Sequence, residues 1–213
     1  MGFIPDVRRI ERATPTKGDR QTLFFSATFT DAIRRLIDQW THEPVEVTIE
    51  PEQVATDNID QKFLMVAGDE KFDILCKYLR EEKIERAIIF ANRRDITRKL
   101  CDRLNKQGLV AGLLSGEVNQ QKRIKTLERF RDGSLPLLVA TDVAGRGIHV
   151  DGVSHVFNYN LPDDSEDYVH RIGRTGRAGT KGTSIALISE DDAFELPALE
   201  EYLGTKLKLE QPR

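Results

Sequence analysis

The residues best suited to chemistry lie in one short stretch, residues 170–177, which read HRIGRTGR. Its arginines Arg171, Arg174 and Arg177 are always charged, and their forked guanidinium groups match the charge that a transferring phosphoryl group spreads over three oxygens. The glycines between them let the backbone approach a ligand or a second domain closely. The stretch therefore predicts a site for a phosphate-bearing substrate. The alternative is a salt-bridged surface turn that faces nearby acidic residues, namely Asp163, Asp164, Glu166 and Asp167.

A second stretch, residues 139–150, reads VATDVAGRGIHV. It places Thr141 and Asp142 ahead of a glycine-rich segment at the carboxyl end of a buried strand, where open α/β sheets bind ligands. A hydroxyl group and the backbone N–H groups at a helix start can hold phosphate oxygens. The alternative is that Gly145 and Gly147 serve only to form a turn.

Three weaker motifs complete the set. Residues 24–28, FFSAT, place Ser26 and Thr28 at the end of a predicted strand, where a hydroxyl could instead cap the following helix. Residues 88–94, IIFANRR, lead from a strand into a basic helix, and residues 120–123, QQKR, follow a turn at Gly116. The last two motifs are also compatible with ordinary solvated helix starts.

The hydrophobic pattern predicts the elements that must position these motifs. Short β-branched or apolar runs alternate with amphipathic segments, which is typical of a parallel sheet covered by helices. In one helix Phe72, Leu75, Cys76 and Leu79 follow one another at i, i+3, i+4 and i+7. The other predicted helices are residues 31–41, 96–104 and 119–131, together with a helix end near residue 10. The predicted strands are residues 22–26, 45–49, 61–66, 87–91, 110–114, 137–140, 155–159 and 183–188.

A change of composition at residues 50–58, EPEQVATDN, predicts a linker between two domains. Residues 59–213 supply most of the predicted strands and form a complete α/β domain. Residues 1–49 supply only a helix end, two strands and one helix, which is too little for an independent core. We therefore expect residues 1–49 to be the end of a domain whose beginning the chain does not contain.

The composition is typical of a folded globular protein, with 213 residues of which 39% are apolar and 31% charged. No window approaches 18 apolar residues and no secretory signal is present, so we expect a cytoplasmic protein without a membrane span. Cys76 and Cys101 lie in helical patterns without metal-binding spacing. We expect two reduced core thiols, and neither a disulfide nor a metal site.

The net charge of −3 hides a basic region. Residues 86–131 contain twelve Lys or Arg and four Asp or Glu, a local charge of +8, so the rest of the chain carries −11. Because surface charges are screened beyond about 8–10 Å, such a region can hold a phosphate backbone despite the net charge. Solvated helix faces are the alternative explanation.

In their order and spacing the five motifs resemble those of the DEAD-box family of superfamily 2 RNA helicases. Residues 26–28 match motif III, residues 89–93 motif IV, residues 120–123 motif IVa, residues 140–147 motif V and residues 170–177 motif VI. Further features are similar to the bacterial RhlB subfamily, namely His149, residues 158–169 and residues 196–204.

The resemblance implies two RecA-like domains that close on ATP, Mg²⁺ and RNA together, with this chain supplying the C-terminal one. It also implies that the chain begins just after the DEAD motif. No GxxxxGK[ST] phosphate loop occurs in the sequence. We therefore expect the preceding RecA-like domain to hold most of the nucleotide and its metal, and this portion alone to be inactive.

The resemblance also implies roles for individual residues. Arg174 and Arg177 match the arginine fingers aimed at the γ-phosphate of ATP, and His170 matches the residue that contacts motif III at Ser26 and Thr28. Asp142 and Arg171 match supporting polar contacts. The residues that match the surface gripping the RNA sugar-phosphate backbone, without base specificity, are Arg93, Gly116, Gln120, Arg123, Thr141 and Gly147.

Position 149 departs from the general DEAD-box pattern, because His149 stands where most members carry Asp for the ATP ribose. Imidazole can still form a hydrogen bond, but it carries no negative charge near neutral pH. Two interpretations therefore stay open: His149 and Gly147 contact the nucleotide, or His149 packs at the end of motif V.

The RhlB-like features imply a protein partner, since RhlB helicases dock on RNase E in an RNA degradosome through this half. The acidic C-terminal residues that could receive a basic segment are Glu190, Asp191, Asp192, Glu195, Glu200 and Glu201. A solvated terminal helix is the alternative. A DNA translocase, which would share the architecture, is disfavoured by the DEAD-box form of motifs III and VI.

Overall fold

The computed structural model describes residues 3–26, 31–48, 58–81, 84–145, 148, 150–177 and 179–212. The chain divides into two compact units, Met1–Pro51 and Glu52–Arg213. Of the predicted linker, residues 50–57 lie outside the described residues. In the described part of the chain, no helix combines the length and apolar character needed to cross a bilayer.

The larger unit contains one seven-stranded sheet in the order β3-β4-β2-β5-β6-β1-β7, and all of its paired strands run parallel. The predicted α/β class is therefore confirmed. The six strands predicted after residue 58 all form, with ends within two residues of the expectation, and only the short β7 was not predicted. The strands are β1 (Ile59–Met65), β2 (Ala87–Phe90), β3 (Ala111–Leu114), β4 (Leu137–Ala140), β5 (His155–Asn158), β6 (Gly182–Ile188) and β7 (Leu209–Glu210).

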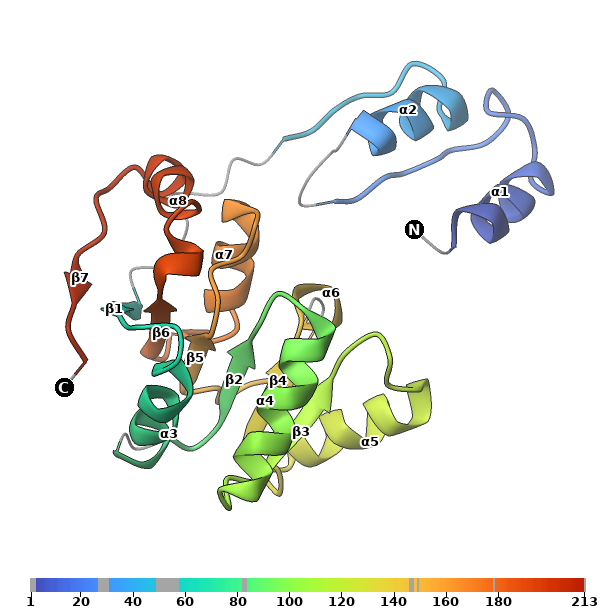
Figure 1. Cartoon of the computed structure of the whole chain (residues 1–213). Coiled ribbons are helices and arrows are strands. Elements are labelled where there is room, and N and C mark those ends of the chain that lie inside the picture. Colours follow the sequence, from blue (N-terminus) through green and yellow to red (C-terminus); the bar gives the residue numbers. More distant parts are fainter. Residues whose placement is uncertain are drawn as a thin grey trace. The chain divides into compact units, whose positions relative to one another are not determined.

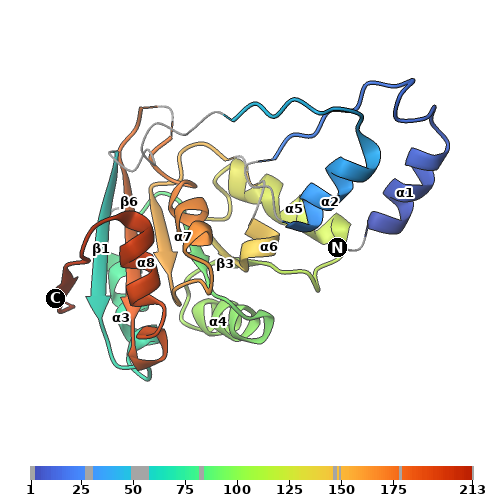
Figure 2. The ribbon, with the colours of Figure 1, turned by 90° about the horizontal axis from the view of Figure 1, so that it is seen from above.

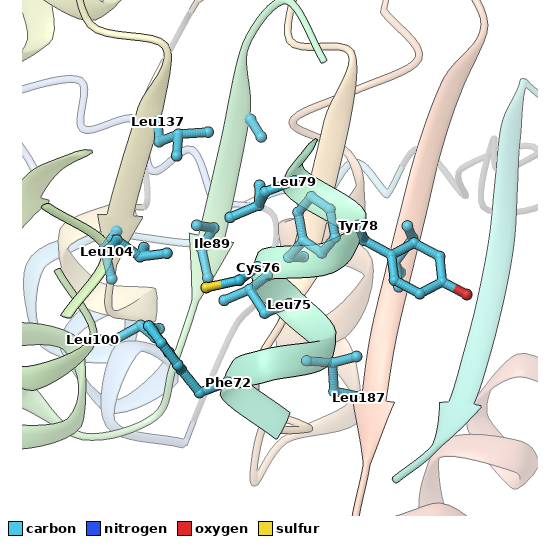
Figure 3. Close-up of a cluster of buried hydrophobic side chains, with 14 of the residues drawn as sticks. Phe72, Leu75, Cys76, Tyr78, Leu79, Ile89, Leu100, Leu104, Leu137 and Leu187 are labelled. Carbon is cyan, nitrogen blue, oxygen red and sulfur yellow. The ribbon is translucent and has the colours of Figure 1, made fainter. Parts of the chain in front are cut away.

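Helices α3 (Lys71–Glu81) and α4 (Arg94–Lys106) cover one face of the sheet (Figure 1). Their apolar side chains meet alternate residues of the strands, such as Ile89 of β2 and Leu187 of β6, as Figure 3 shows. Cys76 lies in this cluster, and both Cys76 and Cys101 are buried and free. The prediction of two core thiols is confirmed.

Among the described residues, four helices cover the opposite face. Phe130 of α5 and Ala144 of α6 pack on β2, β4 and β5, while Tyr168 of α7 and Leu199 of α8 pack on β1 and β6. In Figure 2, α3 and α4 lie together on one side, and α5, α6 and α7 lie on the other. The bounds of these four helices are α5 (Gln120–Arg131), α6 (Asp142–Gly145), α7 (Ser165–Ile172) and α8 (Leu196–Leu203).

The smaller unit contains α1 (Ile4–Arg12) and α2 (Asp31–Trp40), which confirms both predicted helices. Arg20 holds it together, because its guanidinium donates to the Glu11 carboxylate at 2.8 Å and to the Trp40 carbonyl at 3.3 Å.

The two strands predicted in the smaller unit are wrong, since residues 22–26 and 45–48 have no strand structure and residue 49 lies outside the described residues. A strand forms only against a hydrogen-bonding neighbour, and the described part of this unit offers none. The alternating apolar side chains that suggested these strands are instead largely exposed, namely Leu23, Phe25, Val45 and Val47.

Candidate functional site

The motif segments that follow β3, β4 and β2 meet at the carboxyl edge of the sheet because these strands are neighbours, with β5 next to β2. Three backbone hydrogen bonds continue the pairing beyond the strands: Thr141 N–H to Leu114 O at 3.3 Å, Ala91 N–H to Ala140 O at 3.1 Å, and Tyr159 N–H to Phe90 O at 2.8 Å. The segments that follow the four strands therefore form one continuous surface. This is the edge where parallel α/β sheets bind ligands.

Arg171 is the centre of this edge and is only 1% exposed. Its Nε and one terminal nitrogen donate to the two carboxylate oxygens of Asp142 at 2.5 and 2.7 Å. The other hydrogen bonds go to Asn92 Oδ1 at 2.8 Å, Asn158 Oδ1 at 3.2 Å and the Asn160 carbonyl at 2.6 Å. A guanidinium has five N–H donors, so Arg171 uses all of them within the protein. It therefore has no donor left for a ligand, which is compatible with the supporting role that the resemblance implies.

Gly145 allows α6 to lie close to this centre. A Cβ atom at position 145 would lie 2.5 Å from a ring carbon of Phe90, and Phe90 also lies under the Arg171 guanidinium, 5.4 Å from its ring centre. The requirement for glycine at 145 is therefore a close packing contact, and the interpretation as a simple turn glycine is wrong.

Arg174 differs from Arg171 in its partners. In the described part of the chain it donates to two carbonyl oxygens, those of His170 and Ile148, both at 3.0 Å. Burial lowers the pKa of the Arg174 guanidinium, and the neighbouring charge of Arg177 lowers the same pKa further. Arg177 is also half-buried, and its Nε donates to the Gly173 carbonyl at 2.6 Å. Two adjacent positive charges that raise each other's energy favour the binding of an anion.

A close approach also shapes the loop that carries these arginines. A Cβ atom at Gly182 would lie 2.3 Å from Thr175 Oγ1 and 2.5 Å from the Gly176 nitrogen, so only glycine fits at the start of β6. Thr175 Oγ1 also donates to the Val153 carbonyl at 2.5 Å. The loop after α7 is therefore fixed to the sheet and does not hang free as a surface turn.

His170 lies on α7 between two carboxylates, with Glu166 at 3.8 Å and Asp167 at 3.6 Å from its ring nitrogens. Together with Phe90, Asp142, Gly145, Asp167, Arg171 and Arg174 it lines a small hollow. The predicted motif III partner Ser26 lies in an irregular segment of the smaller unit. Thr28, Gly147 and His149 lie outside the described residues.

The residues predicted to bind RNA lie along the same edge. Arg93 is exposed after β2 and pairs with Asp95 at 3.1 Å, while Gln120 is exposed at the start of α5. Arg123 donates to the Ala144 carbonyl at 3.0 Å and so links α5 to α6. Thr141 is buried after β4, and Gly116 follows β3 with Arg94 next to it. The structure thus brings these five residues to neighbouring strand ends.

Sequence reasoning missed the amide partners of Arg171, Asn92 and Asn158, although both stand at strand ends where ligand-site polar residues gather. It also missed Lys71 and Asp192, which form an ion pair with each side chain only 4% exposed. A lysine at the start of a helix and an aspartate in an acidic run carry no pattern that predicts such a pair. In the described residues, no group of three or more His, Cys, Asp or Glu side chains could hold a metal ion.

Comparison with known proteins matches residues 70–179 to the family described as "Helicase conserved C-terminal domain". The chain belongs to this family. Its likeness to DEAD-box RNA helicases, and to RhlB among them, is confirmed by relatives. The ATP-dependent RNA helicase RhlB of Pseudomonas aeruginosa is 57% identical over 100% of this chain and 53% of its own length. RhlB of Shewanella baltica is 46% identical over 96% of this chain and 47% of its own.

Solved structures agree with this family. S. cerevisiae Dbp5 bound to RNA and ADP BeF3 has a TM-score of 0.81 at 30% identity, covering 99% of this chain and 55% of that one. A DEAD box protein from Methanococcus jannaschii has a TM-score of 0.68 at 34% identity, covering 99% and 56%. This helicase C-terminal domain chain thus spans about half the length of its relatives. The RecA-like fold predicted from the motifs is confirmed.

Proposed function

We propose that the chain is the C-terminal portion of an ATP-dependent DEAD-box RNA helicase that couples ATP hydrolysis to local RNA duplex unwinding. Residues 59–213 are its second RecA-like domain, residues 50–58 the linker and residues 1–49 the end of the first domain. The identity to RhlB helicases supports the parent activity. The lack of a phosphate loop in the sequence supports the inference that this portion alone hydrolyses no ATP.

The observation that carries the nucleotide role is the pair Arg174 and Arg177. In the described part of the chain the partners of Arg174 are carbonyl oxygens, and its neighbour adds a like charge. Two like charges held side by side fit the γ-phosphate of ATP, whose negative charge offsets their repulsion. Bound ATP and Mg²⁺ supply the phosphoryl group and a counter-charge, held mainly by the preceding domain. Arg174 and Arg177 stabilise the charge that develops during transfer.

His170 is the proposed coupling residue, since it lies in the same small hollow as Arg174 and matches the family residue that contacts motif III at Ser26 and Thr28. His149 and Gly147 are proposed nucleotide contacts. For His149 the test is the KM for ATP of His149→Ala and His149→Asp at pH 6 and pH 8. An unchanged KM in both variants at both pH values removes His149 from the nucleotide site.

The RNA role rests on the residues gathered at the carboxyl edge of β3, β4 and β2. Arg93 and Arg123 offer positive charge and the exposed Gly116 offers close backbone approach, as sequence-independent binding requires. Thr141 is included from the resemblance, since it is buried after β4. The chain is similar to S. cerevisiae Dbp5, which was solved bound to RNA and ADP BeF3, and this likeness supports an RNA role.

The deciding experiment compares ATP hydrolysis, with and without RNA, by this chain and by a longer protein in which a preceding RecA-like domain is joined to it. We expect RNA-stimulated hydrolysis by the longer protein and none by the chain alone. Stimulation by DNA equal to that by RNA would favour a DNA translocase. RNA-stimulated turnover by the chain alone would contradict the assigned division of the site.

A second role, docking of a basic segment of RNase E in a degradosome, is favoured by one observation. Asp163, Asp164 and Glu201 line a surface hollow together with Tyr202, between α7 and α8. One predicted residue does not take part, because Asp192 is buried. Loss of peptide binding after charge reversal at Glu201 and Asp164 would support docking, and unchanged binding would contradict it. We place the protein in the cytoplasm, where its RNA substrates are.

A further inference from the structure

Two ion pairs lie on either side of one short segment. The first is Arg171 with Asp142, at the candidate site. The second is Lys71 with Asp192, which the site does not use and in which each side chain is only 4% exposed. Lys71 is the first residue of α3, and Asp192 ends the 3₁₀ helix η1 (Glu190–Asp192) that follows β6.

Asp192 is fully engaged inside the protein. Its carboxylate accepts from the Lys71 ammonium, from the Ser189 N–H at 3.0 Å, from the Ser189 hydroxyl at 2.9 Å and from the Leu161 N–H at 2.8 Å. Lys71 also donates to the Tyr159 carbonyl at 3.0 Å. The pair therefore binds the backbone at Tyr159 and at Leu161, the residues on either side of Asn160.

The Arg171–Asp142 pair binds Asn160, the residue that lies between Tyr159 and Leu161. Arg171 donates to the Asn160 carbonyl at 2.6 Å, and the Asn92 side chain, which also accepts from Arg171, donates to the Leu161 carbonyl at 2.7 Å. Tyr159, Asn160 and Leu161 are thus held from one side by Lys71 and Asp192 and from the other by Arg171 and Asn92. A shift of this segment would move the acceptor that helps to fix the Arg171 guanidinium.

Stability alone does not explain the buried Lys71–Asp192 pair. Removing two charges from water is costly, and neutral replacements of similar shape often leave stability unchanged or raise it. What a charged pair with several hydrogen bonds adds is a single defined geometry. We propose that Lys71 and Asp192 are positioning residues, which hold residues 159–161 and through them the Arg171–Asp142 pair. The consequence for RNA binding rests on the proposed function.

The test uses the double variant Lys71→Met/Asp192→Asn, which keeps the net charge and approximate shape. Nitrogen NMR of the 213-residue chain follows hydrogen exchange at Arg171 Nε, which donates to Asp142. We expect this exchange to accelerate about tenfold, because local opening of the network becomes easier. We also expect RNA affinity to fall about threefold to tenfold, as for the loss of one net hydrogen bond.

The control is Lys208→Met/Glu210→Gln, which removes an exposed ion pair at β7 with the same charge balance. It should leave both the exchange rate and the RNA affinity unchanged. If the double variant does not fold, Ser189→Ala, which removes one donor to Asp192, should accelerate the same exchange to a smaller extent.

Exchange at Arg171 Nε that stays at the wild-type rate in a folded variant would overturn the proposal, whatever happens to RNA binding. Faster exchange in a chain whose wild type binds no RNA would support the positioning role. A wild-type chain that binds no RNA would instead contradict the proposed RNA function. Failure of the positioning role and failure of the RNA function therefore give different results.

Discussion

Arg171 and Asp142 form a two-point ion pair, with donor–acceptor distances of 2.5 and 2.7 Å, that joins α7 to the start of α6. Motifs V and VI are therefore one structural unit at the site. Every N–H group of Arg171 is used inside this unit, so we propose that a ligand is contacted by Arg174 and Arg177 instead. On this proposal, the three arginines of one motif have two different tasks.

Arg171→Ala should lower the free energy of unfolding by about 3–5 kcal/mol, because it leaves the Asp142 carboxylate without its partner in a largely buried place. Urea unfolding measures the change. The control is Arg93→Ala, whose ion pair with Asp95 is exposed and is expected to contribute about 0–1 kcal/mol. Equal losses in the two variants would contradict the central role of Arg171.

Arg174→Ala or Arg177→Ala, in a protein that also carries the preceding domain, should lower kcat by about 10³–10⁵ and change the KM for ATP far less. Lysine at either position should restore little of the lost kcat, because its ammonium lacks the planar, forked donor geometry of a guanidinium. Steady-state kinetics and the Tm are measured together. A lower Tm with a normal kcat would indicate that these residues only stabilise a turn. A wild-type kcat in both variants would contradict the assignment of Arg174 and Arg177 as arginine fingers.

Arg123→Ala should weaken RNA binding and make it less sensitive to salt. Each lost phosphate contact reduces the slope of log affinity against log salt by about 0.7 for single strands. Fluorescence anisotropy between about 50 and 200 mM salt measures this slope. Arg8→Ala, which removes the same charge from an exposed position of α1, should keep the wild-type slope, and an identical slope in both variants would argue against Arg123.

Gly182→Ala should destabilise the chain by about 1–3 kcal/mol, the usual result of overpacking, since the new Cβ meets Thr175 and the Gly176 backbone. Gly18→Ala has open space around its Cβ and should be tolerated. Thermal unfolding compares the two. If both substitutions shift the Tm equally, the close approach of the loop to β6 is not what restricts position 182.

The two thiols should be unreactive in the native protein at pH 8, because thiolate is the reactive form. Burial raises the pKa of Cys101 to about 11 and also raises the pKa of Cys76. The unfolded chain loses these protons near pH 9 while the native chain keeps them, so the free energy of unfolding should fall as the pH rises from 9 towards 11. Rapid labelling of both thiols by Ellman's reagent at pH 8 without denaturant would contradict this.

The sheet could be predicted because its buried strands are continuous apolar runs, such as Ala87–Phe90, with amphipathic helices between them. The same reasoning failed at residues 22–26 and 45–48, because an alternating pattern indicates an exposed and a covered face but not the neighbour that must cover it. The motifs after β2, β3 and β4 gave candidate site residues, and the parallel topology explains why these residues lie at one edge.

The contacts within the site could not be predicted. Arg171, Arg174 and Arg177 are chemically alike, and only its five hydrogen-bonded partner atoms mark Arg171 as a guanidinium with no donor left for a ligand. Those partners come from positions as distant as Asn92 and Asn158. The Lys71–Asp192 pair spans 121 positions, and no local pattern signals a contact over that separation.

The amino edge of the sheet at β3 and β4 lies at the far end of these strands from Gly116 and Thr141, which follow their carboxyl ends. The turns that return α4 and α5 to that edge contain Gly108 and Gly133, and both glycines have open space around them. Strands of four residues separate the two edges by about 13 Å. A fluorophore or an affinity tag attached at either turn would therefore report on the domain, or anchor it to a surface, while the carboxyl ends of β3 and β4 stay free.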